Sequence, residues 1–129
     1  MDYQQSRAYI RDAEQYAGGA LDLTNIKEIM KRLGNPQDQL KYIHVAGTNG
    51  KGSVIAYLYT TLMKAGYHVG RYISPSVYSY REKIETEGRP ISREEFAEQT
   101  TRVAAVIEEM TAEGLAHPTP FEIETAVAF

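Results

Sequence analysis

A short glycine-rich turn, AGTNGKGS, from Ala46 to Ser53, carries residue types that suit phosphate binding. Glycines let the backbone adopt positive φ angles and approach a ligand closely. An apolar helical pattern follows, so backbone N–H groups and the partial positive charge of a helix N-terminus would converge on one point. Lys51 could reach terminal phosphates, and the hydroxyl of Ser53 could ligate magnesium. The predicted phosphate-binding residues are Gly47, Thr48, Asn49, Gly50, Lys51, Gly52 and Ser53.

The spacing of this turn departs from the common phosphate loop, G-x-x-x-x-G-K-[ST]. That pattern would need glycine at Val45 and a hydroxyl residue at Gly52. The alternative interpretation is a tight glycine turn that carries a solvated lysine. The agreement of a strand pattern, a turn and a helix pattern in this order favours the phosphate site.

The elements around the turn predict an α/β fold. Residues 41–46 are rich in β-branched and aromatic types and predict a strand, 53–65 predict a helix, and 68–73 predict a second strand. Strand, helix and strand form a βαβ unit, which implies a parallel sheet with a right-handed crossover. The side chains expected on the inner face of this helix are Val54, Ile55, Leu58, Leu62 and Ala65.

Helices are expected before and after this unit in the sequence. The pattern predicts a first helix over 3–16, a second that Thr24 caps and Gly34 ends, a fourth that starts at Ser92 and a last element from Phe121. Residues 74–91 predict either a short hairpin or an ordered loop. The inner face of the fourth helix is expected to carry Phe96, Thr100, Val103, Ile107 and Met110.

Composition narrows the classes of function. The chain has 129 residues and a net charge of −3, which argues against general nucleic-acid binding. It has no cysteine, and no apolar run approaches the roughly 20 residues that cross a bilayer. These features predict a cytoplasmic protein without a membrane partner. The apolar pattern that stops at Phe129 suggests a truncated chain, with a docked C-terminal helix as the alternative.

Four stretches resemble one family. HVAGTNGKGS, from His44 to Ser53, is similar to the ATP loop of the folylpolyglutamate synthase and dihydrofolate synthase family, which is related to the Mur peptide ligases. Mur loops usually carry threonine or serine directly after the lysine, so the order Lys-Gly-Ser favours the folate branch. The other three stretches are LGNPQ at 33–37, AGYHVGRYISPSVYSYREKI at 65–84 and PTPFEIETAVAF at 118–129.

The resemblance implies a truncated Mur-ligase ATPase domain, with a P-loop NTPase-like parallel sheet flanked by helices. Residues 1–40 would be a helical lead-in with the pterin-side loop, and 41–73 the βαβ unit with the phosphate loop. Residues 74–91 would form an ordered substrate loop, and 92–129 a helix and the start of the next element. The rest of the ATPase domain and a C-terminal Rossmann-like domain would be absent, so the chain alone is expected not to complete a turnover.

The resemblance also implies a reaction. The family ligates L-glutamate to folates, or to dihydropteroate, with ATP and Mg²⁺ and through an acyl phosphate, and the intact enzyme is expected to be a monomer. Lys51 would be the catalytic clamp on the γ-phosphate. Ser74 and Glu122 would be metal ligands, with Ser53 as the generic hydroxyl candidate. The pterin-side residues would be Leu21, Asp22, Leu23 and Thr24.

This sequence departs from the family pattern at three points. Ser76 stands where the family often has histidine, and Lys83 stands where it often has arginine. The pterin-side loop lacks the arginine of the usual G-L-x-R. This third departure leaves open which folate is the substrate.

Several alternatives stand beside these assignments. Ser74 could merely start a turn, and Glu122 could be an acid that stabilises a helix N-terminus. Glu124 is a second carboxylate candidate that is expected to be solvated. Residues 81–83 could be a solvated charge run, or could order the loop over the substrate. The alternative functions are another Mur-type or cyanophycin-type amide ligase, and a non-catalytic nucleotide-binding fragment.

Overall fold

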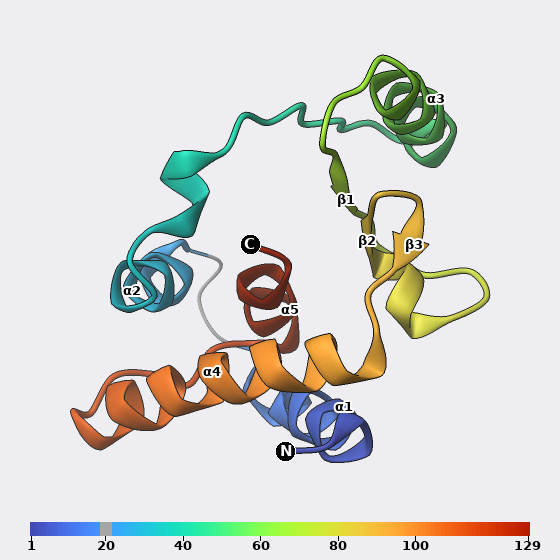
Figure 1. Cartoon of the computed structure of the whole chain (residues 1–129). Coiled ribbons are helices and arrows are strands. Elements are labelled where there is room, and N and C mark those ends of the chain that lie inside the picture. Colours follow the sequence, from blue (N-terminus) through green and yellow to red (C-terminus); the bar gives the residue numbers. More distant parts are fainter. Residues whose placement is uncertain (19–21) are drawn as a thin grey trace. The chain divides into compact units, whose positions relative to one another are not determined.

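The computed structural model describes residues 1–18 and 22–129, which form two units. Unit 1 consists of Met1–Leu40 and Arg93–Phe129, and unit 2 consists of Lys41–Ser92. Figure 1 shows the elements of both. The segment after residue 92 therefore packs with the first forty residues, a grouping that the order of predicted elements along the chain did not suggest.

Unit 1 is helical, as predicted. Its α-helices are α1 (Tyr3–Asp12), α2 (Thr24–Arg32), α4 (Arg93–Ala112) and α5 (Pro120–Ala128). Two short 3-10 helices, Ala13–Tyr16 and Pro36–Gln39, follow α1 and α2. The predicted first helix thus continues to Tyr16, but changes to the tighter 3-10 form for its last turn.

The core of unit 1 lies where α4 packs against α1 and α5, and where α2 packs against α4 and α5. The predicted inner face of α4 is confirmed, because all five of its side chains are buried. The ring of Tyr3 meets the buried ring of Phe96 edge-on, with centroids 5.6 Å apart. The other large apolar side chains buried in this core include Ile10, Ile29, Met30 and Ile123.

The N-terminus of α2 differs in detail from the prediction. Thr24 is the first helical residue rather than the cap, and the cap position belongs to Leu23. The carboxylate of Asp22 accepts a hydrogen bond from the Thr24 N–H at 2.8 Å, which supplies the acceptor that the Leu23 side chain lacks. Gly34 has a φ of +85°, so the predicted left-handed end of this helix is confirmed.

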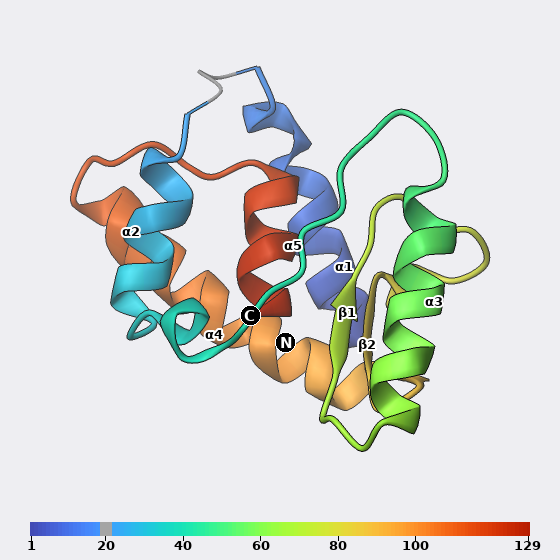
Figure 2. The same ribbon diagram turned by 90° about the horizontal axis from the view of Figure 1, so that it is seen from above.

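Unit 2 combines one helix with a small sheet (Figure 2). Helix α3 (Lys51–Lys64) leads to β1 (Gly70–Tyr72), and β2 (Ile84–Thr86) and β3 (Arg89–Pro90) follow. The strands lie in the order β1-β2-β3 and both pairs are antiparallel, with Arg71 opposite Glu85. A 3-10 helix, Tyr80–Lys83, precedes β2. Of the two predictions for residues 74–91, the hairpin is therefore found at 84–90.

The predicted α/β class is confirmed, but the prediction of a strand over residues 41–46 is wrong. The structure gives these residues no regular secondary structure, and the sheet among the described residues is antiparallel. A strand needs hydrogen bonds to a neighbouring strand, and in the described part of the chain no neighbour pairs with 41–46. Ile43 is accordingly 62% exposed.

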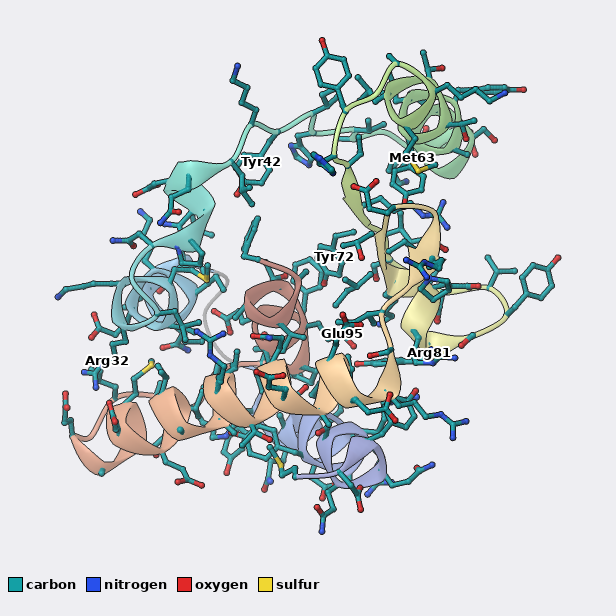
Figure 3. All side chains as sticks on the ribbon, viewed as in Figure 1. Arg32, Tyr42, Met63, Tyr72, Arg81 and Glu95 are labelled. Atoms are coloured by element: carbon teal, nitrogen blue, oxygen red, sulfur yellow. The ribbon has the colours of Figure 1, made fainter. Side chains whose placement is uncertain are left out.

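The buried face of α3 is also shifted from its predicted position. Val54 and Ala65 are exposed, whereas Tyr59 is buried. The Tyr59 hydroxyl accepts the N–H of Gly88 at 2.6 Å, which anchors the turn between β2 and β3 on the helix. Met63, labelled in Figure 3, lies against the same glycine, with its sulfur 3.6 Å from where a Cβ on Gly88 would be.

Candidate functional site

The glycine-rich turn opens directly into the N-terminus of α3. Gly47 and Gly50 have φ angles of +150° and +76°, which residues with a Cβ rarely adopt. The first hydrogen bond within the helix runs from the Val54 N–H to the Gly50 carbonyl, at 3.0 Å. No side chain caps the helix at Gly50. The N–H groups of residues 51–53 therefore stay open at the positive end of the helix dipole, which suits an anion.

Lys51 is the first residue of α3, and its side chain turns back over the loop. Its ammonium donates a hydrogen bond to the carbonyl oxygen of Gly47, four residues earlier. This contact holds the positive charge of Lys51 over the turn, beside the open N–H groups of residues 51–53. The predicted lysine and the predicted glycines are thus brought together in one small region of unit 2.

The remaining polar residues of the loop are accessible. Thr48, Asn49 and Ser53 are all exposed. Ser53 lies in the first turn of α3, and its hydroxyl makes no hydrogen bond to any residue that the structure describes. The hydroxyl is therefore free to take a ligand.

Ser74 follows the end of β1, in the same unit as the phosphate loop. Strand β1 contacts α3 and runs back along it, toward the end where the helix begins (Figure 2). Ser74 is exposed, and among the described residues its hydroxyl has no hydrogen-bond partner. Unit 2 therefore holds a second hydroxyl that is free among the described residues.

Glu122 belongs to unit 1, where it completes the capping box of α5. Its Oε2 accepts hydrogen bonds from the N–H and the hydroxyl of Thr119, at 2.8 and 2.9 Å. The alternative of a helix-terminal acid is therefore realised. The cap uses only Oε2, so Oε1 keeps its lone pairs for a ligand.

The oxygen atoms of these three residues suit Mg²⁺, which prefers hard oxygen ligands and keeps several waters. They comprise the hydroxyls of Ser53 and Ser74 and one carboxylate oxygen of Glu122. Among the described residues, no cluster of three or more histidine, aspartate and glutamate side chains could hold a metal by itself. Ser53 and Ser74 belong to unit 2 and Glu122 belongs to unit 1, so the two hydroxyls and the carboxylate are separate candidate ligands.

The predicted pterin-side residues lie in different local environments. Leu21 lies outside the described residues. Asp22 is engaged at the start of α2, and the hydrogen bond from the Thr24 backbone lowers the pKa of its carboxyl below the ordinary value. Leu23 is 62% exposed, so it is an apolar side chain that could contact a ring.

The expectation that Glu124 is solvated is wrong. Its exposed fraction is 8%, because it lies on the buried side of α5 beside Ile123. It follows Glu122 by two positions, which on a helix turns a side chain well away from that residue's face.

The charged residues 81–83 contact the segment around them, so they are not only a solvated charge run; a role in ordering the loop over a substrate stays a prediction. The Arg81 guanidinium, labelled in Figure 3, donates to the Ile91 carbonyl at 2.9 Å. The Lys83 ammonium lies 4.7 Å from the ring centre of Tyr80. The Glu82 carboxylate accepts the backbone N–H groups of Val77 and Tyr78, which lowers the pKa of this carboxyl.

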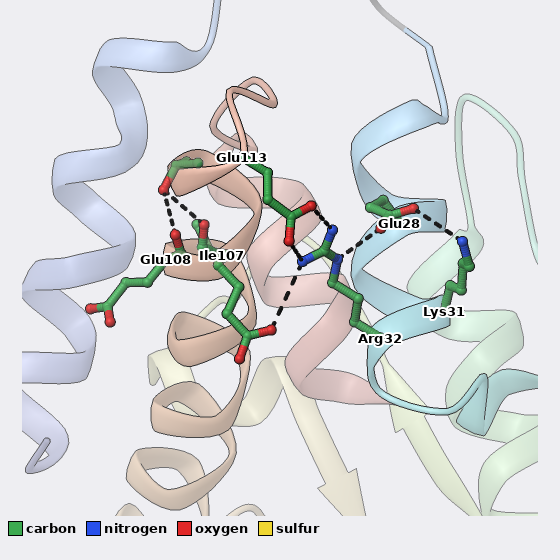
Figure 4. Close-up of polar contacts among 8 residues, drawn as sticks. Glu28, Lys31, Arg32, Ile107, Glu108 and Glu113 are labelled. Carbon is green, nitrogen blue, oxygen red and sulfur yellow. Dashed lines mark hydrogen bonds and ion pairs between the residues drawn. The ribbon is translucent and has the colours of Figure 1, made fainter.

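An ion-pair cluster in unit 1 was not anticipated from the sequence (Figure 4). Arg32, at the end of α2, bridges Glu113 at 2.6 Å and Glu28 at 2.7 Å. The bond to Glu113 joins α2 to the residue just after α4 and holds the pKa of that carboxyl below its usual range. The spacing from Glu28 to Arg32 is a helical i,i+4 pair and could have been found, whereas the long-range partner could not.

No helix in the described part of the chain is long and apolar enough to cross a membrane.

Comparisons with known proteins agree on one family, although no family model matches the chain. The Dihydrofolate synthase/folylpolyglutamate synthase of Bacillus subtilis is 39% identical over 127 residues, which are 98% of this chain and 29% of that protein. The solved folylpolyglutamate synthetase of Lactobacillus casei superposes with a TM-score of 0.90 and 35% identity, over 99% of this chain and 32% of that one.

A third comparison concerns a solved nucleotide complex. The folylpolyglutamate synthase of Mycobacterium tuberculosis complexed with ADP has a TM-score of 0.83 and 28% identity, over 98% of this chain and 29% of that one. This chain therefore spans less than a third of each of the three proteins. Over nearly its whole length, it belongs by homology to the family of folylpolyglutamate and dihydrofolate synthases.

Proposed function

We propose that this chain is the nucleotide-binding part of an ATP-dependent ligase that joins L-glutamate to folates, a tetrahydrofolylpolyglutamate synthase. The observation that carries the proposal is the open N-terminus of α3, with its two positive-φ glycines and Lys51 across the turn. Homology to proteins named for this activity supports the choice of acceptor. It also favours the folate reaction over another Mur-type ligase and over a non-catalytic fragment.

The proposed reaction has two steps. The terminal carboxylate of the folate attacks the γ-phosphorus of ATP, which forms an acyl phosphate and releases ADP. The amino group of glutamate then attacks the acyl carbon, loses a proton, and expels inorganic phosphate as the amide forms. A free carboxylate is a poor electrophile, so the phosphate supplies the leaving group that the amide bond requires.

The residues of the phosphate loop bind and orient ATP in this scheme. The open N–H groups of residues 51–53 would donate hydrogen bonds to phosphate oxygens, and Lys51 would move from the Gly47 carbonyl to the γ-phosphate. Magnesium would neutralise charge that develops on the phosphates. The candidate ligands of that ion are Ser53 and Ser74 in unit 2, and Oε1 of Glu122 in unit 1. Most of the rate enhancement in such a step comes from positioning and charge stabilisation.

The pterin-side contact is proposed for Leu21, Asp22, Leu23 and Thr24. Leu23 offers an exposed apolar side chain, and Asp22 and Thr24 fix the backbone next to it. The resemblance supports this placement. With no arginine in the loop, recognition of the pterin here would depend on apolar contact and backbone groups.

A second activity, ligation of glutamate to dihydropteroate, is favoured by one observation. The Bacillus subtilis relative is named for both activities. Both acceptors present a carboxylate on a pterin-bearing molecule, and they differ by one glutamate and by the reduction of the pterin ring, so we propose that one site serves both. We also propose that the 129 residues form the N-terminal part of an ATP-binding domain, and that the intact enzyme acts in the cytoplasm as a monomer, without a nucleic-acid or membrane partner.

Nucleotide binding tests the proposal. We expect the complete gene product to bind Mg-ATP in a calorimetric titration, and we expect Lys51→Ala to weaken binding by at least about 10-fold, because a charge-assisted contact to phosphate is lost. Lys64→Ala, at the far end of α3, is the matched control and should bind as the wild type does. A wild-type protein that does not bind Mg-ATP would refute the proposal.

A further inference from the structure

The segment after Ser74 is a closed loop with a well-defined base. The N–H of Ile73 donates to the carbonyl of Lys83 at 2.8 Å, and the next pair inward is Tyr72 opposite Ile84 in the sheet. Residues 74–82 therefore leave the sheet and return to it at the same point. A loop with its ends this close can hold a fixed shape if its interior is also tied.

Inside the loop, the carboxylate of Glu82 accepts two backbone N–H groups; we call this pair of hydrogen bonds the Glu82 tie. The Oε1 atom of Glu82 accepts the N–H of Tyr78 at 2.7 Å and also the N–H of Val77. The backbone N–H of Glu82 in turn donates to the Ser79 carbonyl at 3.1 Å. Hydrogen bonds from backbone N–H groups to an ionised carboxylate are stronger than those between neutral groups.

Packing contributes little at the tip of this loop. Val77 is 77% exposed and Tyr78 is 95% exposed, so neither side chain is held by burial. The other two charged side chains of the run act elsewhere. Arg81 bonds to the Ile91 carbonyl and Lys83 faces Tyr80, and neither contact reaches the backbone of residues 77–78.

Ser74 lies between the two fixed points of the loop. The preceding residue, Ile73, is held by the base of the loop, and Val77, three residues later, is held by Glu82. We propose that Glu82 is a positioning residue, which fixes the backbone that presents the Ser74 hydroxyl to the magnesium–nucleotide complex. This inference rests on the proposed function, because it assigns Glu82 a role only through Ser74.

Hydrogen exchange of the complete gene product tests the tie itself, independently of any ligand. Glu82→Ala removes the acceptor, so exchange of the Val77 and Tyr78 amides should accelerate by about 10-fold or more. Glu82→Gln keeps a neutral acceptor and should give a smaller acceleration. Glu87→Ala is the matched control, because Glu87 accepts a backbone N–H at the opposite end of β1, from Val69, and should leave both amides unchanged.

A second measurement tests whether the tie positions Ser74. ATP affinity is measured by titration with and without Mg²⁺. The dissociation constant without the metal, divided by the dissociation constant with it, gives the effect of the metal. In Glu82→Ala this ratio should fall by about 10-fold, while the affinity without metal stays unchanged, because the phosphate loop is intact. Glu82→Gln should recover part of the ratio, and Glu87→Ala should match the wild type.

The outcomes separate this inference from the proposed function. Unchanged amide exchange in Glu82→Ala would overturn the tie, and faster exchange with an unchanged metal ratio would overturn the positioning role. If the wild type binds no ATP at all, the proposed function itself is contradicted and the positioning role falls with it, whatever the amides show.

Discussion

At the scale of single residues, Gly50 couples backbone conformation to the proposed site. Its φ of +76° lets the turn enter α3 with the N–H groups open. A residue with a Cβ pays about 1–2 kcal/mol in this conformation. We therefore predict that Gly50→Ala destabilises the protein by about that amount and also weakens ATP binding, as denaturation and titration would show.

The matched control for Gly50 is Gly114, which has a φ of +86° at the end of α4. Gly114→Ala should carry a similar cost in stability but leave ATP binding intact, since it lies in unit 1 and outside the phosphate loop. Equal weakening of ATP binding by both variants would mean that general destabilisation, rather than the geometry of the turn, explains the effect.

The pH dependence of stability follows from Glu82. Its pKa is lowered from an ordinary value of 4.5, chiefly by the hydrogen bond from the Tyr78 backbone. A carboxyl with a lower pKa in the folded state stabilises the fold above its unfolded pKa, and that contribution is lost as pH falls through the folded pKa. We predict that the wild type is more stable than Glu82→Gln at neutral pH, and that this advantage disappears in acid.

Thermal unfolding across a pH series checks this prediction, with Glu82→Gln as the reference that cannot titrate. An advantage that persists at pH values well below the ordinary glutamate range would show that the carboxylate is not what holds the loop.

At the scale of elements, the elements predicted correctly were those that local sequence specifies. The helices α1, α2 and α4 follow from apolar residues repeated at helical spacing, because a helix makes its backbone hydrogen bonds within itself. The strand over 41–46 was wrongly predicted, because a strand exists only if another strand pairs with it. β-branched residues at 43 and 45 could not reveal that no described strand does so.

Some features of the candidate site could likewise be predicted from the sequence, and others could not. The glycine-rich turn and its lysine could be predicted from residue types between a strand pattern and a helix pattern, although their spacing departs from the common phosphate loop. The Glu82 tie could not, because a side chain that bonds to backbone N–H groups a few residues earlier leaves no periodic pattern. The burial of Tyr59 was missed for a related reason, since it depends on where the hairpin turn at Gly88 docks.

The ion-pair cluster gives a prediction about the joining of α2 to α4. Arg32→Gln removes the bridges to Glu113 and Glu28 and leaves acidic groups without their cation. We expect the melting temperature to fall by roughly 2–4 °C at low salt, and this difference to shrink at 1 M salt, because exposed charges are screened.

Lys31→Gln is the control for this prediction, because Lys31 makes only a 3.9 Å contact to Glu28 and is largely exposed. It should change the melting temperature little at either salt concentration. An effect of Arg32→Gln that does not depend on salt would show that the arginine acts through packing of its aliphatic stem rather than through charge.

At the scale of the whole molecule, the chain spans only part of the length of the relatives that it matches. The chain spans 29% of its Bacillus subtilis relative and 32% of the solved Lactobacillus casei protein. Within it, the phosphate loop and Ser74 share unit 2, whereas Glu122 and the pterin-side residues belong to unit 1.

Formation of product by the complete gene product would test the proposed ligase activity. The protein would be incubated with Mg-ATP and L-glutamate, with tetrahydrofolate and, separately, with dihydropteroate, and the products resolved by mass. We predict an acceptor lengthened by glutamate, with one ADP formed for each amide bond and no product from Lys51→Ala. If neither acceptor gains glutamate while the protein still binds ATP, the folate-ligase account is contradicted.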